Sequence, residues 1–490
     1  AVGKDALEAN TTASNNTAMG NYALLSNTTG ANNVALGASA LQSNTTASEN
    51  VAVGYAALYD NSTGSLNTAV GSNALRYNTT GVSNTAMGRL ALYVNVGGAY
   101  NSAYGMNSLK DNTSGNYNVA MGYEALQANT SGTSNTGVGM YSGKFTTTGQ
   151  GITAIGYSAL NANTTASYNT AVGYQALTAN TTGGQNTAVG MQALADNTTG
   201  PSNTAVGQVA LASNTTGGGN NAIGYHALET NTTGSANNAF GESALRYATT
   251  ANYNTAFGNG ALITNTVSSY NTAVGNQALY IGNRTADANG FNTAVGHQAG
   301  YSGSTAQFNT YIGQSSGFYV TTGSKNTILG CYTGNFGGLD IRTTSNNIVL
   351  SDGDGNPRAH FNASGHPFFP AIRASAGTYT AKISAGTAEL TYDTSSARYK
   401  DNIRDSTYGL SAAMQLQSRM FEYKEDDQRT DVGFIAEEVN EVIPELVVID
   451  SEGRPDAVNY DRMVSVLVKA IQEQQEIIDS LTARIEALES

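Results

Sequence analysis

Few side chains in this sequence of 490 residues are of the types that carry out chemistry, and they lie far apart. The segment from Asp352 to Gly355 offers carboxylates to Ca²⁺, but it lacks the distal glutamate of an EF-hand loop, which favours a plain turn. Cys331, the single cysteine, is expected to be a small buried residue. The four histidines are too scattered for a metal site: His226, His297, His360 and His366. We therefore predict no metal and no cofactor.

A series of short motifs near the C-terminus is chemically more specific. It opens with Ser395-Ser396-Ala397-Arg398-Tyr399-Lys400-Asp401-Asn402-Ile403, and the later motifs are Tyr408-Gly409-Leu410, Phe421-Glu422-Tyr423, Val432-Gly433-Phe434-Ile435-Ala436-Glu437-Glu438-Val439, Pro444-Glu445-Leu446-Val447 and Val458-Asn459-Tyr460. Their order and spacing resemble the endosialidase-type intramolecular chaperone peptidase domain of phage tail spikes and fibres. The resemblance covers nearly all of residues 395–490.

This resemblance implies a self-cleaving domain. Family members use a serine nucleophile and, five residues later, a lysine base, and these places hold Ser395 and Lys400 here. Ser395 would attack the carbonyl of Thr394 and cut its own chain. A lysine accepts the hydroxyl proton only when burial or a neighbouring cation, such as Arg398, lowers its pKa. Ser396 replaces the usual Asp and Glu437 the usual Gln, and the implied activity is at most a single-turnover autoproteolysis.

The rest of the chain is a repeat. Beginning at Asn16, the phrase Asn-Thr-Ala-apolar-Gly or a close variant returns every 17 residues over sixteen units. A fixed period of this kind predicts a stack of similar coils. Gly, Asn and Thr disfavour a helical repeat, which we considered as the alternative, so we predict a parallel β-solenoid shaft with two short strands in each unit.

The unit from Asn169 to Gln185 shows what each place does, with Asn169 as the first place. The apolar fourth place and the usual Leu at the ninth are predicted to form the core columns, and Ala at the third and eighth places suits a narrow interior. Gly at the fifth place predicts a corner with positive φ. Asn-Thr-Thr-Gly at places twelve to fifteen predicts a second corner.

The repeat phrase also resembles the head repeats of trimeric autotransporter adhesins, which form parallel β-rolls with three chains side by side. Because the apolar stripe of a single coil is narrow, three chains that share their apolar faces would make a larger core. We therefore expect a trimeric shaft.

Charge marks the domain boundaries. Residues 395–490 hold 20 acidic and 10 basic side chains, whereas residues 1–394 hold 15 and 12. We predict a mainly β chain in three parts: a repeat β-solenoid shaft at 1–350, a β-rich neck or tip at 351–394, and an α+β chaperone domain at 395–490 that ends in a trimeric coiled coil at 463–490.

Apolar residues near the C-terminus are spaced in alternating steps of four and three. This is the a/d pattern of a left-handed coiled coil, and Ile mixed with Leu on the seam favours three strands. The predicted trimerisation seam consists of Leu467, Ile471, Gln474, Ile478, Leu481, Ile485 and Leu488.

Composition excludes several classes of function. A net charge of −13 argues against binding to nucleic acid, and no run approaches the 18 apolar residues of a membrane span, so no membrane insertion is expected. A glycan-degrading spike would need paired carboxylates in a groove, and the shaft has few acidic residues.

Two functions remain: a homotrimeric phage tail fibre in the virion that attaches to the host cell surface, or a trimeric adhesin on a bacterial cell surface. Aromatic residues after Gly275, with Phe361, Phe368 and Phe369 nearest the tip, suggest two alternatives: they bind a glycan receptor, or they plug and narrow the end of the solenoid. The sequence opens at the third place of a unit, so we expect a preceding region that joins other tail proteins.

Overall fold

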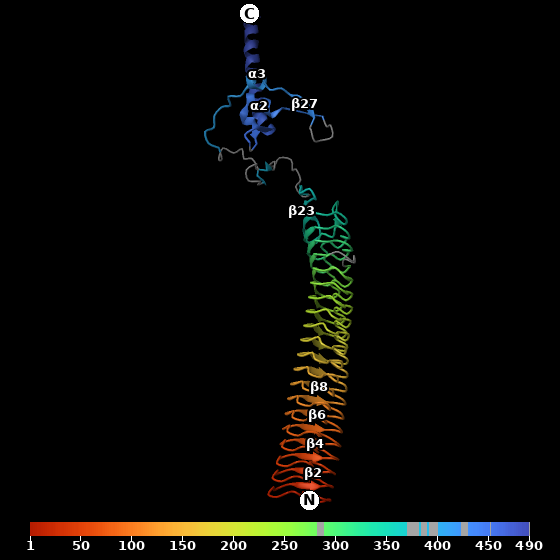
Figure 1. Cartoon of the computed structure of the whole chain (residues 1–490). Coiled ribbons are helices and arrows are strands. Elements are labelled where there is room, and N and C mark those ends of the chain that lie inside the picture. The colour runs from red at the N-terminus through yellow and green to blue at the C-terminus, as the bar shows by residue number, and fades with distance from the viewer. Residues whose placement is uncertain are drawn as a thin grey trace. The chain divides into compact units, whose positions relative to one another are not determined.

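The structure is a computed structural model that describes residues 1–281, 289–369, 382–383, 390–391, 400–422, 430–450 and 452–489. The chain divides into two compact units, Ala1–Arg373 and Ala374–Ser490. The first unit is a parallel β-solenoid whose coils stack in chain order (Figure 1). The α-helices of the described part all lie in the second unit. The prediction of a mainly β chain with a solenoid shaft of 17-residue repeats is confirmed.

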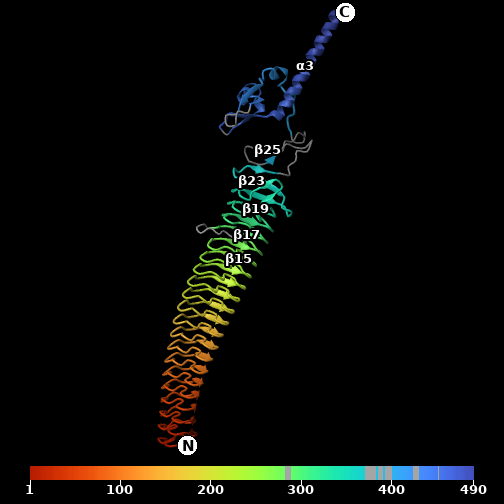
Figure 2. The same cartoon turned by 90° about the vertical axis from the view of Figure 1, so that its right-hand side faces the viewer.

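Each coil of the shaft contributes one strand of three residues. The strands are β1 (Thr17–Met19), β2 (Val34–Leu36), β3 (Val51–Val53), β4 (Thr68–Val70), β5 (Thr85–Met87), β6 (Ser102–Tyr104), β7 (Val119–Met121), β8 (Thr136–Val138), β9 (Thr153–Ile155), β10 (Thr170–Val172), β11 (Thr187–Val189), β12 (Thr204–Val206), β13 (Asn221–Ile223), β14 (Asn238–Phe240), β15 (Thr255–Phe257), β16 (Thr272–Val274), β17 (Thr293–Val295), β18 (Thr310–Ile312) and β19 (Thr327–Leu329). Equivalent residues of successive coils pair in parallel, as Thr170 does with Thr187, so the strands form one continuous ladder along the shaft (Figure 2).

The prediction of two strands in each repeat is wrong, because the other side of the coil consists of turns. Gln175 and Leu177, at the seventh and ninth places, have φ of 54° and 51°, which an extended strand does not allow. The turn side still bonds to the next coil: the Leu177 N–H donates to the Ala193 carbonyl at 3.0 Å, and the Thr181 N–H donates to that of Thr198 at 2.9 Å. Backbone hydrogen bonds therefore join successive coils on both sides.

The fifth-place glycine forms the predicted corner. Gly173 has a φ of 142°, and a Cβ added to it would lie 2.4 Å from the carbonyl oxygen of Gly190 in the next coil. Both the conformation and the close approach of two backbones require glycine at this place.

Three columns of small or branched apolar side chains fill the interior. Ala171, Ala176 and Leu177, at the third, eighth and ninth places, are fully buried, as predicted. The fourth place is not a core column: Val172 is half-buried, and Met87 is 42% exposed. Successive residues of a strand point to opposite faces, so an inward Ala at the third place directs the fourth place outward.

Two rows of buried asparagines complete the interior. Asn180, at the twelfth place, donates from Nδ2 to Oδ1 of Asn163 at 3.2 Å and to the Gly183 carbonyl at 3.0 Å. Asn169, at the first place, donates to the same carbonyl at 2.9 Å, and its Oδ1 accepts the N–H of Asn186 at 2.8 Å. Because buried amides must be hydrogen-bonded, these rows fix the register of the coils as strictly as the apolar columns do.

The shaft ends in two small additions. β20 (Asn335–Phe336) and β21 (Leu339–Asp340) form a separate antiparallel pair, and β22 (Ile348–Ser351), β23 (Pro357–Phe361) and β24 (Pro367–Phe368) extend the sheet of the shaft. β22 continues the parallel ladder, and β23 and β24 follow it in antiparallel order. The Asp352 carboxylate accepts hydrogen bonds from the Asn356 backbone and from Arg358 Nε, both at 2.9 Å, so this segment is a turn closed by its own side chains.

His360 ends the first-place asparagine row. Asn347, at the first place of the coil that contains β22, donates to Asn326 as in the shaft, and its Oδ1 contacts Nε2 of His360 at 3.0 Å. An imidazole N–H therefore takes the place of the backbone N–H that a further coil would donate. His360 is buried, and this burial lowers the pKa of its imidazole below the usual value.

The second unit holds several short elements and one long helix. They are β25 (Lys382–Ile383), β26 (Leu390–Thr391), α1 (Leu410–Ala413), β27 (Arg419–Glu422), β28 (Thr430–Gly433), α2 (Ala436–Val442), the 3₁₀ turn η2 (Pro444–Leu446), β29 (Val447–Ile449), β30 (Pro455–Val458) and α3 (Tyr460–Glu489). The short elements α1 and η2 pack against the long helix. The core of the unit consists of Val439, Ile443, Leu446, Met463 and Val466.

Candidate assembly and attachment surfaces

The predicted coiled-coil seam lies on the exposed part of α3. Met463, Val466 and Ala470 are the buried residues of this helix, and all three lie in its first eleven residues. From Leu467, which is 47% exposed, to Leu488, which is 86% exposed, the apolar seam residues are open to solvent. Gln474 is exposed as well. The structure places the seven seam residues on one continuous helix, and it shows no second helix against them in the described part of the chain.

Several of the short motifs of the C-terminal part meet at the first half of α3. The Tyr460 hydroxyl accepts the N–H of Phe434 at 2.9 Å, and the Glu473 carboxylate accepts the N–H of Leu410 at 2.7 Å. A hydrogen bond to Glu445 raises the pKa of the Tyr408 hydroxyl. The motifs thus anchor α3 to the small core of the unit.

Two glycines allow these contacts. A Cβ added to Gly433 would lie 2.5 Å from the Tyr460 hydroxyl oxygen, and one added to Gly409 would overlap the Glu473 carboxylate. Sequence reasoning identified both glycines as parts of motifs but missed Tyr460 and Glu473 as their partners. The sequence signal for these contacts was the glycine that stands beside an aromatic or apolar residue in each of the two motifs. A glycine in that place indicates that another group packs closely against the backbone.

The predicted cleavage site is only partly described. Ser395 and Thr394 lie outside the described residues, so the distance between the Ser395 hydroxyl and the Lys400 amine is not defined. Lys400 is the first described residue after this segment, and it is exposed. Glu437, on α2, is exposed as well. The self-cleaving dyad therefore stays a prediction.

The strand side of the shaft carries an outward stripe of apolar side chains. The fourth place is apolar or aromatic in every coil, and the second place beside it is Thr, Val, Ser, Asn or Ile. No charged residue occurs at either place from β1 to β19 or in β22. The fourth-place residues, here named the outer stripe, are Met19, Leu36, Val53, Val70, Met87, Tyr104, Met121, Val138, Ile155, Val172, Val189, Val206, Ile223, Phe240, Phe257, Val274, Val295, Ile312, Leu329 and Leu350. A charge-free apolar stripe of this length is typical of an interaction surface.

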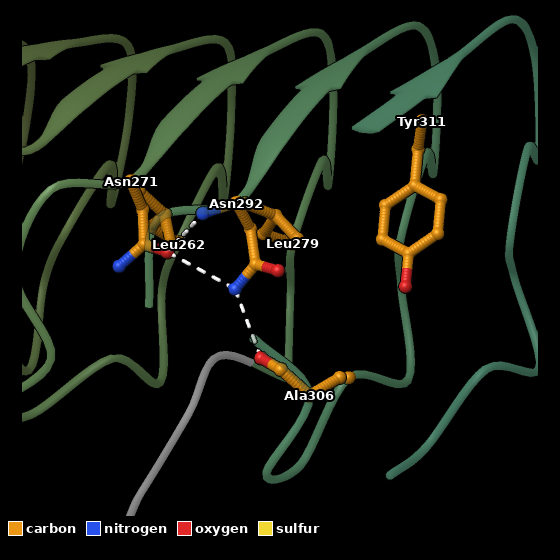
Figure 3. A pocket seen from close by; sticks show the side chains of 7 residues that line it. Leu262, Asn271, Leu279, Asn292, Ala306 and Tyr311 are labelled. Carbon is orange, nitrogen blue, oxygen red and sulfur yellow. Dashed lines mark hydrogen bonds between the residues drawn. The ribbon is translucent and has the colours of Figure 1, made fainter. Parts of the chain in front are cut away.

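Surface aromatics form stacks along the shaft. The rings of Tyr253, Tyr270, Phe291 and Phe308 occupy one place of successive coils, with centroids 4.9–5.2 Å apart and planes within 14° of parallel. Because each inner ring is covered on both faces by its neighbours, only the two end rings offer a face to a sugar. Tyr311, one of the aromatic residues that follow Gly275, is not on the surface but buried in the interior (Figure 3).

The three predicted receptor-binding phenylalanines lie at the end of the shaft. Phe361 on β23 is half-buried, and Phe368 on the adjacent strand β24 is 62% exposed. Phe369 follows β24 and is half-buried. The strand pairing brings Phe361 and Phe368 onto neighbouring strands, and both stand beside polar residues such as Asn362 and His366.

Membrane-spanning helices and clusters of metal-ligating side chains are two further kinds of functional feature. No helix among the described residues is long and apolar enough to cross a bilayer. Groups of three or more metal-ligating side chains are likewise absent from the described ranges.

Comparison with known families identifies the C-terminal part. Residues 395–448 match the family described as chaperone of endosialidase. No curated protein and no solved structure is detectably similar to the chain. A chaperone of endosialidase domain that follows a β-solenoid shaft of 17-residue repeats fits a tail fibre or tail spike.

Proposed function

We propose that this tail fibre- or spike-like chain, with its intramolecular chaperone, is the subunit of a homotrimeric phage tail fibre that attaches the virion to the host cell surface. The observation that carries the proposal is the chaperone of endosialidase domain at residues 395–448, joined to a long repeat shaft. The shaft provides reach, and the second unit provides the assembly step.

The seam of α3 supports association of copies of this chain. A helix with exposed Leu and Ile at every a and d place except Gln474 is unfavourable in water by itself, and it is stabilised when the same residues of other chains cover it. Ile at the a places with Leu at most d places favours two strands when taken alone, so three chains are proposed from the chaperone domain and the repeat shaft rather than from the seam. The anchored base of α3 would bring three seams together in the same register.

The outer stripe supports lateral packing of the three shafts. Its residues stand at one place in every coil, so three parallel chains in register bring like side chains together along the whole length. This role replaces the predicted one, in which the fourth place filled the core of a single coil.

Charged variants of the outer stripe test the packing. Val172→Asp with Val189→Asp would place six unpaired carboxylates between three shafts, and we expect the soluble trimer to be lost in sedimentation. The matched control is Thr182→Asp with Thr199→Asp on the turn side of the same coils, where Thr182 is exposed. A trimer that tolerates the stripe variant as well as the control would show that the stripe is not between chains.

We further propose that the chaperone separates itself from the fibre. The Ser395 hydroxyl would attack the carbonyl carbon of Thr394 while Lys400 takes its proton. The peptide C–N bond would then break as the Ser395 nitrogen is protonated, and water would hydrolyse the resulting ester. The released fibre could no longer use the chaperone to reverse its assembly, so its stability would be kinetic.

A denaturing gel tests the cleavage. We expect the 50.6 kDa chain to yield a large fragment that ends at Thr394 and a small C-terminal fragment of roughly a fifth of its mass. Ser395→Ala and Lys400→Ala should leave the chain whole, and both variants should still form trimers. If the wild type also stays whole, the dyad is inactive in this protein.

Attachment is proposed to use the end of the shaft, at Phe361, Phe368 and Phe369, with a glycan as the receptor. An exposed ring such as Phe368 can stack on the C–H face of a sugar, while nearby amides bind its hydroxyls. Phe368→Ala should reduce adsorption of the fibre to host cells at least tenfold, and Tyr168→Ala, an exposed ring in the regular shaft, is the control. Deletion of the two coils at 169–202 should leave adsorption intact; if it abolishes adsorption of a correctly assembled trimer, recognition lies along the shaft.

A further inference from the structure

A cluster of aromatic and charged side chains stands on the turn side of the shaft, in the coils of β3, β4 and β5. The tenth place of these coils holds Tyr59, Arg76 and Tyr93, and the eleventh place of the first two holds Asp60 and Tyr77. The Asp60 N–H donates to the Arg76 carbonyl at 2.9 Å, and the Tyr77 N–H donates to that of Tyr93 at 3.1 Å. Because coils bonded in this way lie about 4.8 Å apart, the five side chains are neighbours on one face, here named the Arg76 cluster.

The rings of the Arg76 cluster lie around the guanidinium group and are not stacked in parallel. The Cζ atom of Arg76 lies 5.3 Å from the ring centre of Tyr59 and 5.4 Å from that of Tyr77. Tyr77 and Tyr93 meet edge to face, with ring centres 4.9 Å apart and planes at 73°. An edge-to-face pair leaves more ring face open than the parallel stacks farther along the shaft, and Tyr77 is exposed.

Arg76 lacks the carboxylate partner that an equivalent arginine has. Arg246 and Tyr247 occupy the same two places as Arg76 and Tyr77, and Nε of Arg246 donates to the Glu229 carboxylate in the preceding coil at 2.7 Å. In the described part of the chain, Arg76 forms no ion pair. Because a guanidinium group carries five N–H donors in a fixed fork, Arg76 still has donors to offer to a ligand.

Asp60 places an acceptor next to these donors. No described residue donates a hydrogen bond to its carboxylate, which is half-buried. Burial raises the pKa of this carboxyl, and the charge of Arg76 opposes the rise. A carboxylate that has lost part of its water and has no other donor is stabilised when a hydroxyl donates to it.

We propose that the Arg76 cluster binds one neutral hexopyranose unit of a cell-surface glycan. The C–H face of the sugar lies against Tyr77, Arg76 donates to one sugar hydroxyl, and Asp60 accepts from another. Sites for small polar ligands combine an aromatic surface with a few fixed polar groups, and the cluster supplies a ring, a donor and an acceptor. A neutral sugar fits better than an acidic one, because Asp60 would repel a second carboxylate.

The position of the cluster keeps it independent of the other proposed surfaces. It lies on the turn side of its coils, whereas the outer stripe lies on the strand side, so partner chains can cover the stripe and leave the cluster open. It is also separate from the proposed attachment at Phe368, and either site can fail without the other.

Saturation-transfer NMR on the full-length protein tests the site. The protein carries Phe368→Ala, so that the proposed site at the end of the shaft does not contribute, and the probes are the methyl glycosides of glucose, galactose, mannose and N-acetylglucosamine. We expect transfer to the ring protons of at least one probe, and Tyr77→Ala, Arg76→Thr and Asp60→Ala should each raise its Kd about tenfold. The regular unit carries Thr178 and Ala179 at these two places, so the variants should fold normally. Absence of transfer to all four probes overturns the proposal.

The matched control is Tyr247→Ala in the same background. Tyr247 is exposed to a similar degree as Tyr77, but its neighbour Arg246 is already paired with Glu229, so the Kd should not change. An equal rise in Kd for this control would mean that any exposed tyrosine of the shaft binds the probe, which also overturns the proposal. Methyl glucuronide, as an acidic probe, should bind more weakly than the neutral glycoside; tighter binding that Asp60→Ala does not weaken would make the cluster an anion site instead.

Discussion

In the shaft, Ala171, Ala176 and Leu177 are fully buried inside a single chain, whereas on α3 the apolar row from Leu467 to Leu488 is exposed. The two regions obtain their stability differently. Each coil of the shaft closes its own interior and then bonds to its neighbours through backbone and asparagine hydrogen bonds. The buried residues of α3 lie in its first eleven residues, and the apolar row of its remaining turns is exposed.

From the sequence, the closed core of a coil and the association of three chains form one requirement, whereas the structure shows that they are separate. A narrow apolar stripe seemed to need three chains to build a core for each coil. The structure shows instead that the interior is complete without partners, because buried asparagines supplement the small apolar columns. On our proposal, the exposed row of α3 brings the chains together, and the outer stripe extends their association along the shaft.

The largest effect is expected on the seam of α3. Ile478→Asp with Leu481→Asp places two carboxylates per chain in the apolar interface of the coiled coil, which should abolish the trimer. We expect sedimentation to show monomers or aggregates. Ser480→Asp with Ala483→Asp adds the same charge off the seam and should leave the trimer intact. An intact trimer from the seam variant would remove the coiled coil from the assembly mechanism.

A smaller effect is expected when a single apolar side chain of one coil is shortened to alanine. The ninth place and the fourth place should then differ. Leu177→Ala leaves a cavity in the closed interior, and it should lower the unfolding free energy by about 2–5 kcal/mol. Val172→Ala on the outer stripe should cost less than about 1 kcal/mol in an isolated shaft, because that side chain is already half-exposed. Chemical denaturation of both variants measures the difference. Equal losses would mean that the fourth place is buried after all.

The smallest effect concerns His360 at the end of the asparagine row. Burial lowers the pKa of this imidazole in the folded state, so the unfolded chain binds the proton more readily. The contribution of the neutral imidazole is therefore fully present above about pH 6.5, and it is lost as the pH falls below that value. We expect the amide hydrogens at the end of the shaft to have lower protection factors at pH 5 than at pH 8, once the measured exchange rate is divided by the intrinsic base-catalysed rate at each pH. His360→Gln should remove this dependence, and an unchanged dependence in the variant would assign it to another group.

Much of the shaft could be predicted because its period is exact. The columns at the third, eighth and ninth places and the glycine corner follow from residue type alone. The fourth place was assigned wrongly, since it is as apolar as the ninth; the alternation of a strand, in which Ala171 and Val172 cannot both point inward, was the signal that should have decided it. The prediction of a second strand in each unit was wrong for another reason. Leu177 has a φ of 51°, a conformation that leucine rarely adopts, so the residue type did not predict the turn.

The candidate sites were predictable to different degrees. The motifs of residues 395–448 led to the chaperone family, and the heptad led to the helix that carries the seam. The partners of these motifs, such as Glu473 for Leu410, depend on contacts across 63 positions of sequence, which no local pattern contains. The roles of Ser395 and Lys400 rest on the family pattern, because the chemistry depends on a distance that sequence spacing does not fix.

The hydrogen bonds that join successive coils on both the strand side and the turn side also decide how the shaft responds to mechanical load. These bonds run from coil to coil, so a pull along the shaft stretches all the bonds of one interface together, and none can break without its neighbours. Such a fibre is stiff in extension, and its strength is that of its weakest interface. Thr146 in the coil of β8 and Ile152 in the coil of β9 each take the place of an interior asparagine, and the interface between these two coils is the one in the regular shaft where we expect a stretched fibre to part first.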